Sequence, residues 1–257
     1  MTSFPHPFPL RALPNGWRVG EFPPLAGLCG LAHAVTTRSG PLFGPHAESP
    51  ATAAACAALA TTVSLRDAAW CRQVHGATVL VAAQGGLAGE ANALVTHTDG
   101  LGVIGRSADC PIVLAADSVS RVAGMAHASW RSTVQGITGR MIGTMVARGA
   151  DPARLVCAIA PSAGPCCYEV GAEVRAAALA GIGPHAAEFF AARADSRFVF
   201  DLWAANVDQL RRAGVLPAHI TVAGVCTLCR NDLFPSWRRE GEQAGRFGSI
   251  IGWRAPA

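Results

Sequence analysis

The stretch ADCPIVLAADSVSRVAGMAHASWR, residues 108–131, places an apolar run on either side of the short segment DSVS. The two runs have the length of buried strands, and they predict an antiparallel hairpin whose two-residue loop is Ser118-Val119. In that register Cys110 lies directly opposite His127. Directly opposed residues share one face of a sheet, with Cβ atoms about 4.5–5.5 Å apart. The stretch therefore predicts a thiol and an imidazole side by side at the open end of a hairpin.

Both faces of this hairpin are largely apolar, as expected of strands buried between two layers. Strands and helices alternate along the rest of the chain without a linker or a break in composition. The alternation predicts one α/β domain over residues 1–257, with residues 1–30 as an irregular, proline-rich N-terminal arm. We expect helices over residues 51–61, 133–150, 168–183 and 201–215, and strands over residues 77–84, 101–109, 154–160, 219–225 and 248–253.

Composition narrows the class of protein. Hydrophobic residues make up 51% of the 257 residues and charged residues 15%, which is ample for a sizeable core. The net charge of +4 is mild and no basic run is interleaved with aromatic residues, so nucleic acid is not the expected partner. No run approaches the roughly 18 apolar residues of a membrane span, and the N-terminus is too rich in proline for a signal peptide. The nine cysteines are an odd, scattered set rather than a disulfide framework, so we expect a soluble, cytoplasmic protein.

A Cys/His pair supports either a nucleophilic thiolate or a metal site, and it is also compatible with a buried thiol beside a hydrogen-bonded histidine. His75, in CRQVHGATVLVAA, stands just before an apolar strand-like run and is the candidate third ligand. Three protein ligands and one open position are typical of a catalytic zinc site. Cys226 and Cys229 form a lone CxxC motif, and we interpret them, like the adjacent Cys166-Cys167, as structural cysteines.

Six blocks in order, QVHG, ADC, MAHASWRS, APSAGPCCYEVGAEV, DLWAANVDQL and CTLCRNDLFPSWRREGEQAGRFGSIIGW, resemble a known family. This family was once described as laccase-like multicopper polyphenol oxidases. Its members are now regarded as zinc-dependent purine nucleoside phosphorylases with adenosine deaminase activity, and some are called peptidoglycan editing factors. The resemblance runs from about Thr36 to the C-terminus, and it implies an αββα layered sandwich with mixed β-sheets. It also implies that His75, Cys110 and His127 bind Zn²⁺ and are catalytic.

The implied substrates are purine nucleosides and phosphate, which would give a free base and ribose 1-phosphate. Arginine binds phosphate oxygens with its planar fork, so Arg38 and Arg131 are candidate phosphate ligands. Tyr168, the only tyrosine, is a candidate for stacking on a base or bonding to a sugar, and Arg238 and Arg239 are weaker candidates. Asp109 is expected to point away from Cys110, in a supporting role.

The sequence departs from the family pattern in two places. HASWRS replaces the usual HAGWRG, so Ser129 and Ser132 stand where glycines are expected, and their hydroxymethyl groups would either narrow the pocket or add hydrogen bonds. The segment HAESPATAAA replaces a typical SLNLG-like block.

Two other functions are compatible with the sequence, and a third is disfavoured. A Cys/His hydrolase or amidase acting on peptidoglycan precursors would use Cys110 as a nucleophile. A non-catalytic binding protein would result if the two serines blocked the pocket. Laccase-type oxidation is disfavoured, because it needs several copper centres and the eight histidines are scattered.

Overall fold

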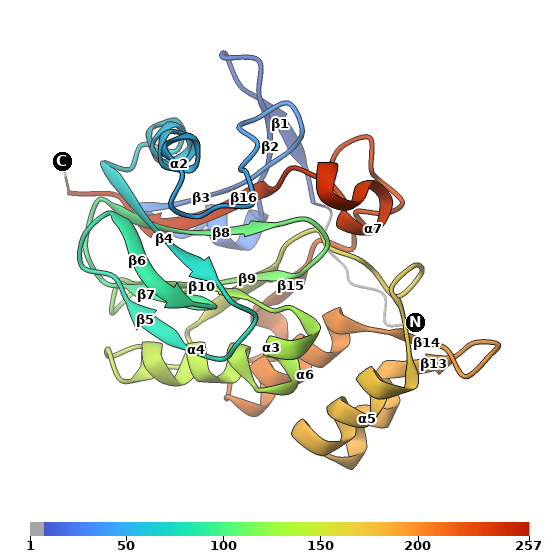
Figure 1. The fold of residues 1–257 in the computed structure, drawn as a ribbon. Coiled ribbons are helices and arrows are strands. Elements are labelled where there is room, and N and C mark those ends of the chain that lie inside the picture. Colours follow the sequence, from blue (N-terminus) through green and yellow to red (C-terminus); the bar gives the residue numbers. More distant parts are fainter. Residues whose placement is uncertain (1–7, 257) are drawn as a thin grey trace.

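A computed structural model of the chain describes residues 8–256; residues 1–7 of the predicted arm, and Ala257, lie outside the described range. Two large β-sheets pack face to face, and helices cover their outer faces (Figure 1). The first sheet has seven strands in the order β1-β2-β3-β16-β8-β4-β6. Their bounds are Leu10–Ala12 (β1), Arg18–Gly20 (β2), Leu31–Thr36 (β3), Phe247–Trp253 (β16), Leu101–Ser107 (β8), Asp67–Gln73 (β4) and Gly86–Ala91 (β6).

The second sheet has six strands in the order β15-β11-β9-β10-β7-β5. Their bounds are Ile220–Val222 (β15), Val156–Ile159 (β11), Ile112–Asp117 (β9), Val122–His127 (β10), Ala93–Thr96 (β7) and Val79–Val81 (β5). Both sheets are mixed: β4 runs parallel to β8 and β11 runs parallel to β15, whereas β9 and β10 are antiparallel. Between the sheets lies a core that includes Val103, Leu114, Met125 and Ile251, all fully buried.

Helices complete the αββα order (Figure 1). Helix α2 (Pro50–Thr62) buries Cys56 and Leu59 against the outer face of the first sheet. Helices α3 (Trp130–Val134), α4 (Ile137–Val146) and α6 (Leu202–Arg212) cover the second sheet, where Met141 and Met145 of α4 pack on its strands. No helix within residues 8–256 has the length and apolar character needed to cross a membrane.

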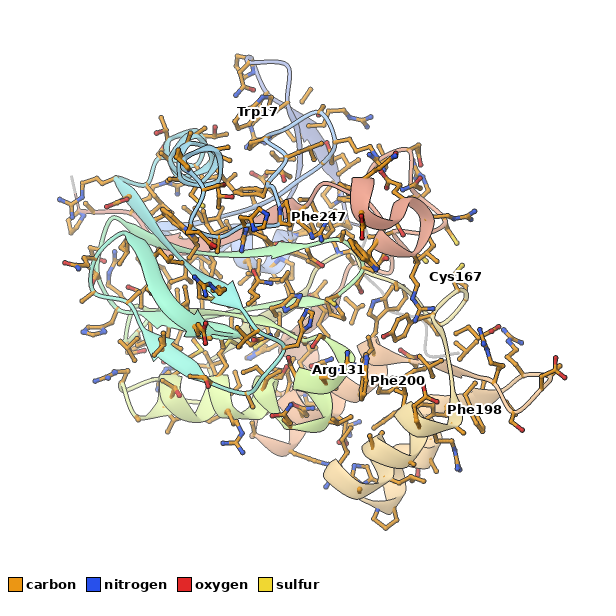
Figure 2. All side chains as sticks on the ribbon, viewed as in Figure 1. Trp17, Arg131, Cys167, Phe198, Phe200 and Phe247 are labelled. Atoms are coloured by element: carbon orange, nitrogen blue, oxygen red, sulfur yellow. The ribbon has the colours of Figure 1, made fainter. Side chains whose placement is uncertain are left out.

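A smaller unit extends from this sandwich. It contains a three-stranded sheet of β12 (Glu169–Val170), β14 (Phe198–Phe200) and β13 (Phe190–Ala192), with α5 (Ala172–Gly181) beside it. Phe190 stacks on Phe200 with ring centroids 4.3 Å apart and meets Phe198 edge-on at 6.3 Å. Figure 2 labels Phe198 and Phe200 in this unit. The remaining helical turns are α1 (Pro23–Ala26), α7 (Trp237–Glu240), η1 (Pro184–Phe189), η2 (Pro217–His219) and η3 (Gly241–Gln243).

The hairpin of residues 108–131 forms, but the predicted register is wrong by two residues. His127 lies opposite Ile112, and Asp117 lies opposite Val122, so the loop is Ser118–Arg121. A Ser-Val pair does not adopt the positive φ that a two-residue loop requires. The longer loop solves this because Arg121 takes φ +52° and Asp117 accepts hydrogen bonds from the Val119 N–H and the Ser120 hydroxyl.

Most predicted elements are present, with two changes. The helix predicted over residues 133–150 is interrupted at Gly136, whose φ of +77° ends one helical segment, α3, and begins the next, α4. Glu169 and Val170 form strand β12 instead of the start of a helix, and the helix begins at Ala172. Asp201 caps α6 as predicted, by accepting a hydrogen bond from the Ala204 N–H. Residues 10–26 hold two short strands and a helical turn, so this part of the predicted arm is more regular than expected.

Candidate metal centre

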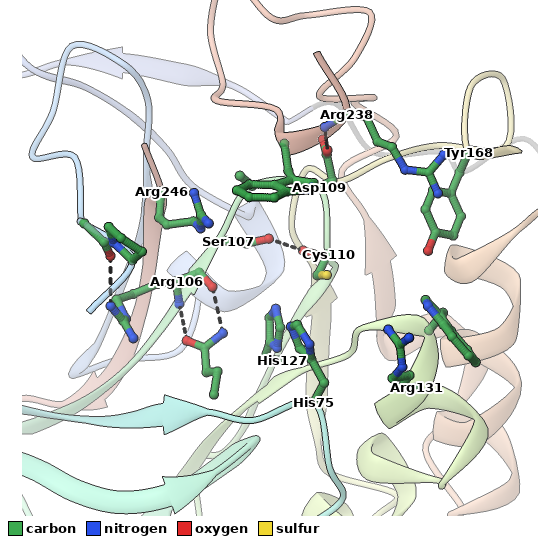
Figure 3. Close-up of a pocket in the computed structure, with 16 residues that line it drawn as sticks. His75, Arg106, Ser107, Asp109, Cys110, His127, Arg131, Tyr168, Arg238 and Arg246 are labelled. Atoms are coloured by element: carbon green, nitrogen blue, oxygen red, sulfur yellow. Dashed lines mark hydrogen bonds between the residues drawn. The ribbon is translucent and has the colours of Figure 1, made fainter. Parts of the chain in front are cut away.

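His75, Cys110 and His127 meet at one end of the two sheets (Figure 3). His75 lies in the turn after β4 with φ +60°, Cys110 lies between β8 and β9, and His127 ends β10. One ligand atom from each of the three lies within 4.8 Å of the others, and the two imidazole rings stack with centroids 5.3 Å apart. The chain therefore brings together the three side chains that the sequence predicts as ligands.

The slip of the hairpin register does not separate Cys110 from His127. Cys110 is two residues before Ile112, the cross-strand partner of His127, and side chains two residues apart share a face. Just before it, Asp109 takes φ +93°, which turns the backbone at the end of β8. The Ala128 N–H donates to the carbonyl of Pro111, so the two segments stay paired beyond the strands.

A buried amide network holds the ring of His127. Nδ2 of Asn92 lies 3.1 Å from Nδ1 of His127 and donates to the Ser132 hydroxyl over 3.0 Å. The Gly76 N–H, next to His75, donates to Oδ1 of the same amide. Ser132 in turn lies 2.8 Å, Oγ to Oγ, from Ser129, which caps α3. The two serines in place of glycines thus add hydrogen bonds; neither lines the pocket.

The protonation states of these groups follow from burial and charge. Burial, together with His75 and Arg106, lowers the pKa of His127 to about 3. Desolvation, Arg131 and Arg246 lower the pKa of His75. Burial and the neighbouring Asp109 raise the pKa of the Cys110 thiol to about 12. At neutral pH both imidazoles are therefore uncharged and can act as metal ligands. The Cys110 thiolate forms only if a cation replaces the proton of the thiol.

The carboxylate of Asp109 is turned away from this cluster and is fully engaged. Its Oδ1 accepts a 2.6 Å hydrogen bond from the Thr227 hydroxyl, and its Oδ2 accepts a 2.7 Å bond from the Arg238 N–H. Asp109 thus anchors the segment that carries Cys110 to two later loops, in the supporting role expected for it.

The cluster lines a cavity of about 510 Å³ whose charge is strongly positive. Arg106, Arg131, Arg238 and Arg246 line it, and Asp109 is the one carboxylate among its lining residues. Arg106 is 6% exposed, and its Nε has no hydrogen-bond partner within the described residues. The sequence reasoning missed Arg106 and Arg246, because nothing in their neighbourhood marks the ends of β8 and β16 as walls of one pocket.

Of the other residues predicted for the site, Arg131 and Tyr168 line the cavity and Arg38 does not. Arg131 lines the cavity and stacks on Trp130, and Tyr168 lines it beneath the Arg238 guanidinium, 4.9 Å from the ring centroid (Figure 3). The structure does not bring Arg38 to this cavity. Its guanidinium group is held instead by the Glu240 carboxylate and the Asn231 carbonyl.

Comparison with known proteins places the chain in a family. Residues 46–254 match the family described as multi-copper polyphenol oxidoreductase laccase. The purine nucleoside phosphorylase of Deinococcus radiodurans is 36% identical over 235 residues, which cover 86% of this chain and 89% of that protein. Purine nucleoside phosphorylase YlmD of Geobacillus stearothermophilus is 35% identical over 196 residues, covering 72% and 71%.

Two further comparisons add to this. Adenosine deaminase RL5, from an unknown prokaryotic organism, is 34% identical over 155 residues, covering 60% of this chain and 59% of that protein. The crystal structure of YlmD from Geobacillus stearothermophilus superposes with a TM-score of 0.83 at 27% identity, over 97% of this chain and 100% of that one. The chain therefore belongs to the multi-copper polyphenol oxidoreductase laccase family, and the relatives described above are named purine nucleoside phosphorylase or, for RL5, adenosine deaminase.

Proposed function

We propose that this protein is a zinc-dependent purine nucleoside phosphorylase, with His75, Cys110 and His127 as its zinc ligands. The observation that carries the proposal is the convergence of these three side chains on the wall of an arginine-lined cavity. The names of the relatives from Deinococcus and Geobacillus support the reaction class. We further propose that residues 1–257 act as one catalytic domain in the cytoplasm, whose reducing conditions suit nine cysteines that form no disulfide bond within residues 8–256.

The donor set fits zinc. Two neutral imidazoles and one thiolate are ligands that zinc favours, and three protein ligands leave one coordination position for a substrate or water. Copper chemistry of the laccase kind needs several histidine-rich centres, whereas the three-residue cluster holds two histidines and the other group of potential ligands in residues 8–256 is formed by cysteines. When bound here, zinc supplies Lewis acidity that polarises a substrate oxygen or activates water.

The arginines that line the cavity are suited to bind phosphate beside the zinc site. Arg246 faces the cluster closely enough to disfavour protonation of both histidines. Arg106 offers, from a buried position, an Nε–H that has no hydrogen-bond partner among residues 8–256. Arg131 lies on the opposite side, beside His75 (Figure 3). Each guanidinium group can bind two oxygens of one phosphate. In a cavity shielded from water, these arginines would hold a phosphate dianion against the anomeric carbon of a nucleoside.

The remaining walls are suited to a purine nucleoside. A volume of about 510 Å³ lies within the range of small-molecule sites. Trp130, Tyr168 and Trp237 offer aromatic faces, and Tyr168 is kept protonated because burial raises its pKa. A neutral phenol in this position donates a hydrogen bond to a ring nitrogen or a sugar oxygen. The amide of Gln73 is engaged by the Arg106 backbone and fixes that strand end rather than a ligand.

The same site supports deamination of adenosine as a second activity. That reaction requires an activated water and no phosphate. The name of the relative RL5, an adenosine deaminase 34% identical over 155 residues, supports this second activity. The alternative of a Cys/His hydrolase is less well supported. A thiol with a pKa of about 12 beside an imidazole with a pKa of about 3 does not form the thiolate–imidazolium pair that such enzymes need.

The test is to incubate the purified protein with adenosine, with and without phosphate, and to separate the products. Phosphorolysis predicts adenine and ribose 1-phosphate in equal amounts, only when phosphate is present. Deamination predicts inosine under both conditions. Absence of product from adenosine, inosine, guanosine and methylthioadenosine in a zinc-containing preparation would overturn the proposal and favour a binding protein.

A further inference from the structure

Four cysteines gather outside the pocket, at the ends of two neighbouring strands. Cys166 and Cys167 lie in the loop after β11, and Cys226 and Cys229 lie in the loop after β15. Because β11 and β15 are parallel neighbours, both loops leave the same edge of the sheet. The four sulfur atoms all lie within 4.8 Å of one another. The CxxC motif that stands alone in the sequence thus acquires its second pair through the fold.

The spacing of the sulfur atoms is that of ligands around one ion. Sγ of Cys229 lies 3.6 Å from Sγ of Cys166 and 3.4 Å from Sγ of Cys167. Four thiolates at about 2.3 Å from a tetrahedral zinc lie about 3.8 Å from one another. Disulfide bonds do not account for the group, since all four cysteines are free thiols. The four sulfur atoms therefore form one group rather than two bonded pairs.

Backbone N–H groups surround the most buried of these sulfurs. The Gly164 N–H donates to Sγ of Cys226 over 3.3 Å, and Cys226 is 5% exposed. The N–H groups of Cys229 and Leu228 also donate toward this sulfur. The two loops are also joined by their backbones, because the Ser162 N–H donates to the Val225 carbonyl and the Thr227 N–H donates to the Ser162 carbonyl. The backbone of the two loops therefore positions these thiols.

The two loops bring four sulfur atoms into one small volume, all within 4.8 Å of one another. Four like charges in this volume repel one another, and a divalent, thiophilic cation at their centre removes that cost. Tetrahedral sites of four sulfur ligands select zinc or iron–sulfur chemistry, and a site whose four positions are all filled by protein is structural.

We propose that Cys166, Cys167, Cys226 and Cys229 bind a second zinc ion, whose role is to fix two loops that form one wall of the pocket. Tyr168 directly follows Cys167 and lines the cavity. Thr227, between the ligands of the CxxC motif, donates to Asp109, the residue before Cys110. Cys167 lies away from the sandwich, on the side of the smaller unit (Figure 2), so this zinc connects the smaller unit to the pocket.

The test measures zinc per chain in the full-length protein and in variants that each affect one site. We expect two zinc ions in the wild type, one in His127→Ala and one in the double variant Cys226→Ser/Cys229→Ser. Cys29→Ser removes an exposed cysteine outside both clusters and is the matched control, with two zinc ions expected.

X-ray absorption at the zinc edge of His127→Ala keeps the test decisive if the double variant fails to fold. Four sulfur neighbours at about 2.3 Å are expected. A His127→Ala protein without zinc, with nitrogen or oxygen neighbours around its zinc, or with iron in its place would overturn the assignment. Neither readout uses nucleoside cleavage, so failure of the proposed enzymatic function leaves this result unchanged.

Discussion

The hydroxyl of Thr227 donates a 2.6 Å hydrogen bond to Oδ1 of Asp109, which links the loop carrying Cys226 and Cys229 to the residue before Cys110. Both residues are buried, and Asp109 has an unusual φ of +93° that this bond helps to hold. A charge-assisted bond in such a place positions the backbone of the neighbouring ligand.

Thr227→Val removes the hydroxyl and keeps the shape of the side chain. We expect the zinc affinity of the His75, Cys110 and His127 site to fall by about 10–100-fold, because the ligand segment loses an anchor. Competition with a chromophoric chelator measures this. Thr227→Ser retains the hydroxyl and should stay near the wild-type affinity; equal affinities for valine and serine would contradict the positioning role.

Asn92→Ala deletes the amide that links the His127 ring, the Gly76 N–H and the Ser132 hydroxyl. Because these groups are left without a partner in a buried region, we expect the free energy of unfolding to fall by about 2–4 kcal/mol. Denaturant unfolding of the metal-free protein measures the change. Asn15→Ala, at an exposed turn, is the comparison, and a similar small loss in both variants would show that the network contributes little.

Arg246→Met keeps much of the side-chain volume and removes a charge that disfavours protonation of both histidine ligands. We expect kcat/KM for phosphate to fall by about 10–100-fold, with a smaller change in KM for adenosine, since a charge-assisted bond to phosphate is lost. Arg38→Met tests, by the same change in kcat/KM for phosphate, the sequence-based prediction that Arg38 binds phosphate. The structure predicts less than about threefold for Arg38, whose guanidinium group binds Glu240. The reverse order of the two effects would place the phosphate elsewhere.

The carboxylate of Asp117 is expected to make the stability of the fold depend on pH in the acid range. Burial alone would raise its pKa, but hydrogen bonds from the Arg154 side chain and from the Val119 and Asp151 N–H groups lower it to about 2, from an ordinary 3.8. The unfolded chain binds this proton more tightly, so the stabilisation is present above about pH 4 and is lost as the pH falls through about 2.

The lowered pKa of Asp117 contributes about 2 kcal/mol to the free energy of unfolding at neutral pH. Denaturant unfolding of Asp117→Asn between pH 6 and pH 2 should show a lower stability at pH 6 and a shallower decline below pH 4. A decline as steep as that of the wild type would show that other carboxylates determine the acid limit.

The hairpin at residues 108–131 illustrates what the sequence allows one to predict. Period-two alternation fixes which side chains share a face, and a slip of two residues preserves that relationship, so Cys110 and His127 meet although the predicted loop was wrong. Loop geometry depends on local hydrogen bonds to Asp117, which no pattern of apolar residues encodes.

Groups that meet only through the tertiary fold were not predictable in this way. Arg106 and Arg246 reach the pocket from the ends of two strands of one sheet, far apart in the chain. The two cysteine pairs are separated by nearly sixty residues and meet because β11 and β15 are adjacent and parallel. Conversely, Arg38 has the residue type expected of a phosphate ligand. Its ion pair with Glu240 could not be predicted, because the two residues are far apart in the sequence.

The most direct test of the central claim is adenine release from adenosine by zinc-depleted and zinc-reloaded protein, with and without phosphate. His127→Ala, which keeps the four-cysteine cluster, is measured in parallel. The account predicts phosphate-dependent cleavage that disappears on depletion, returns with zinc, and is absent from His127→Ala throughout. Cleavage that persists in the depleted protein or in His127→Ala, and stops when Cys110 is alkylated, would contradict it and assign the chemistry to the thiol.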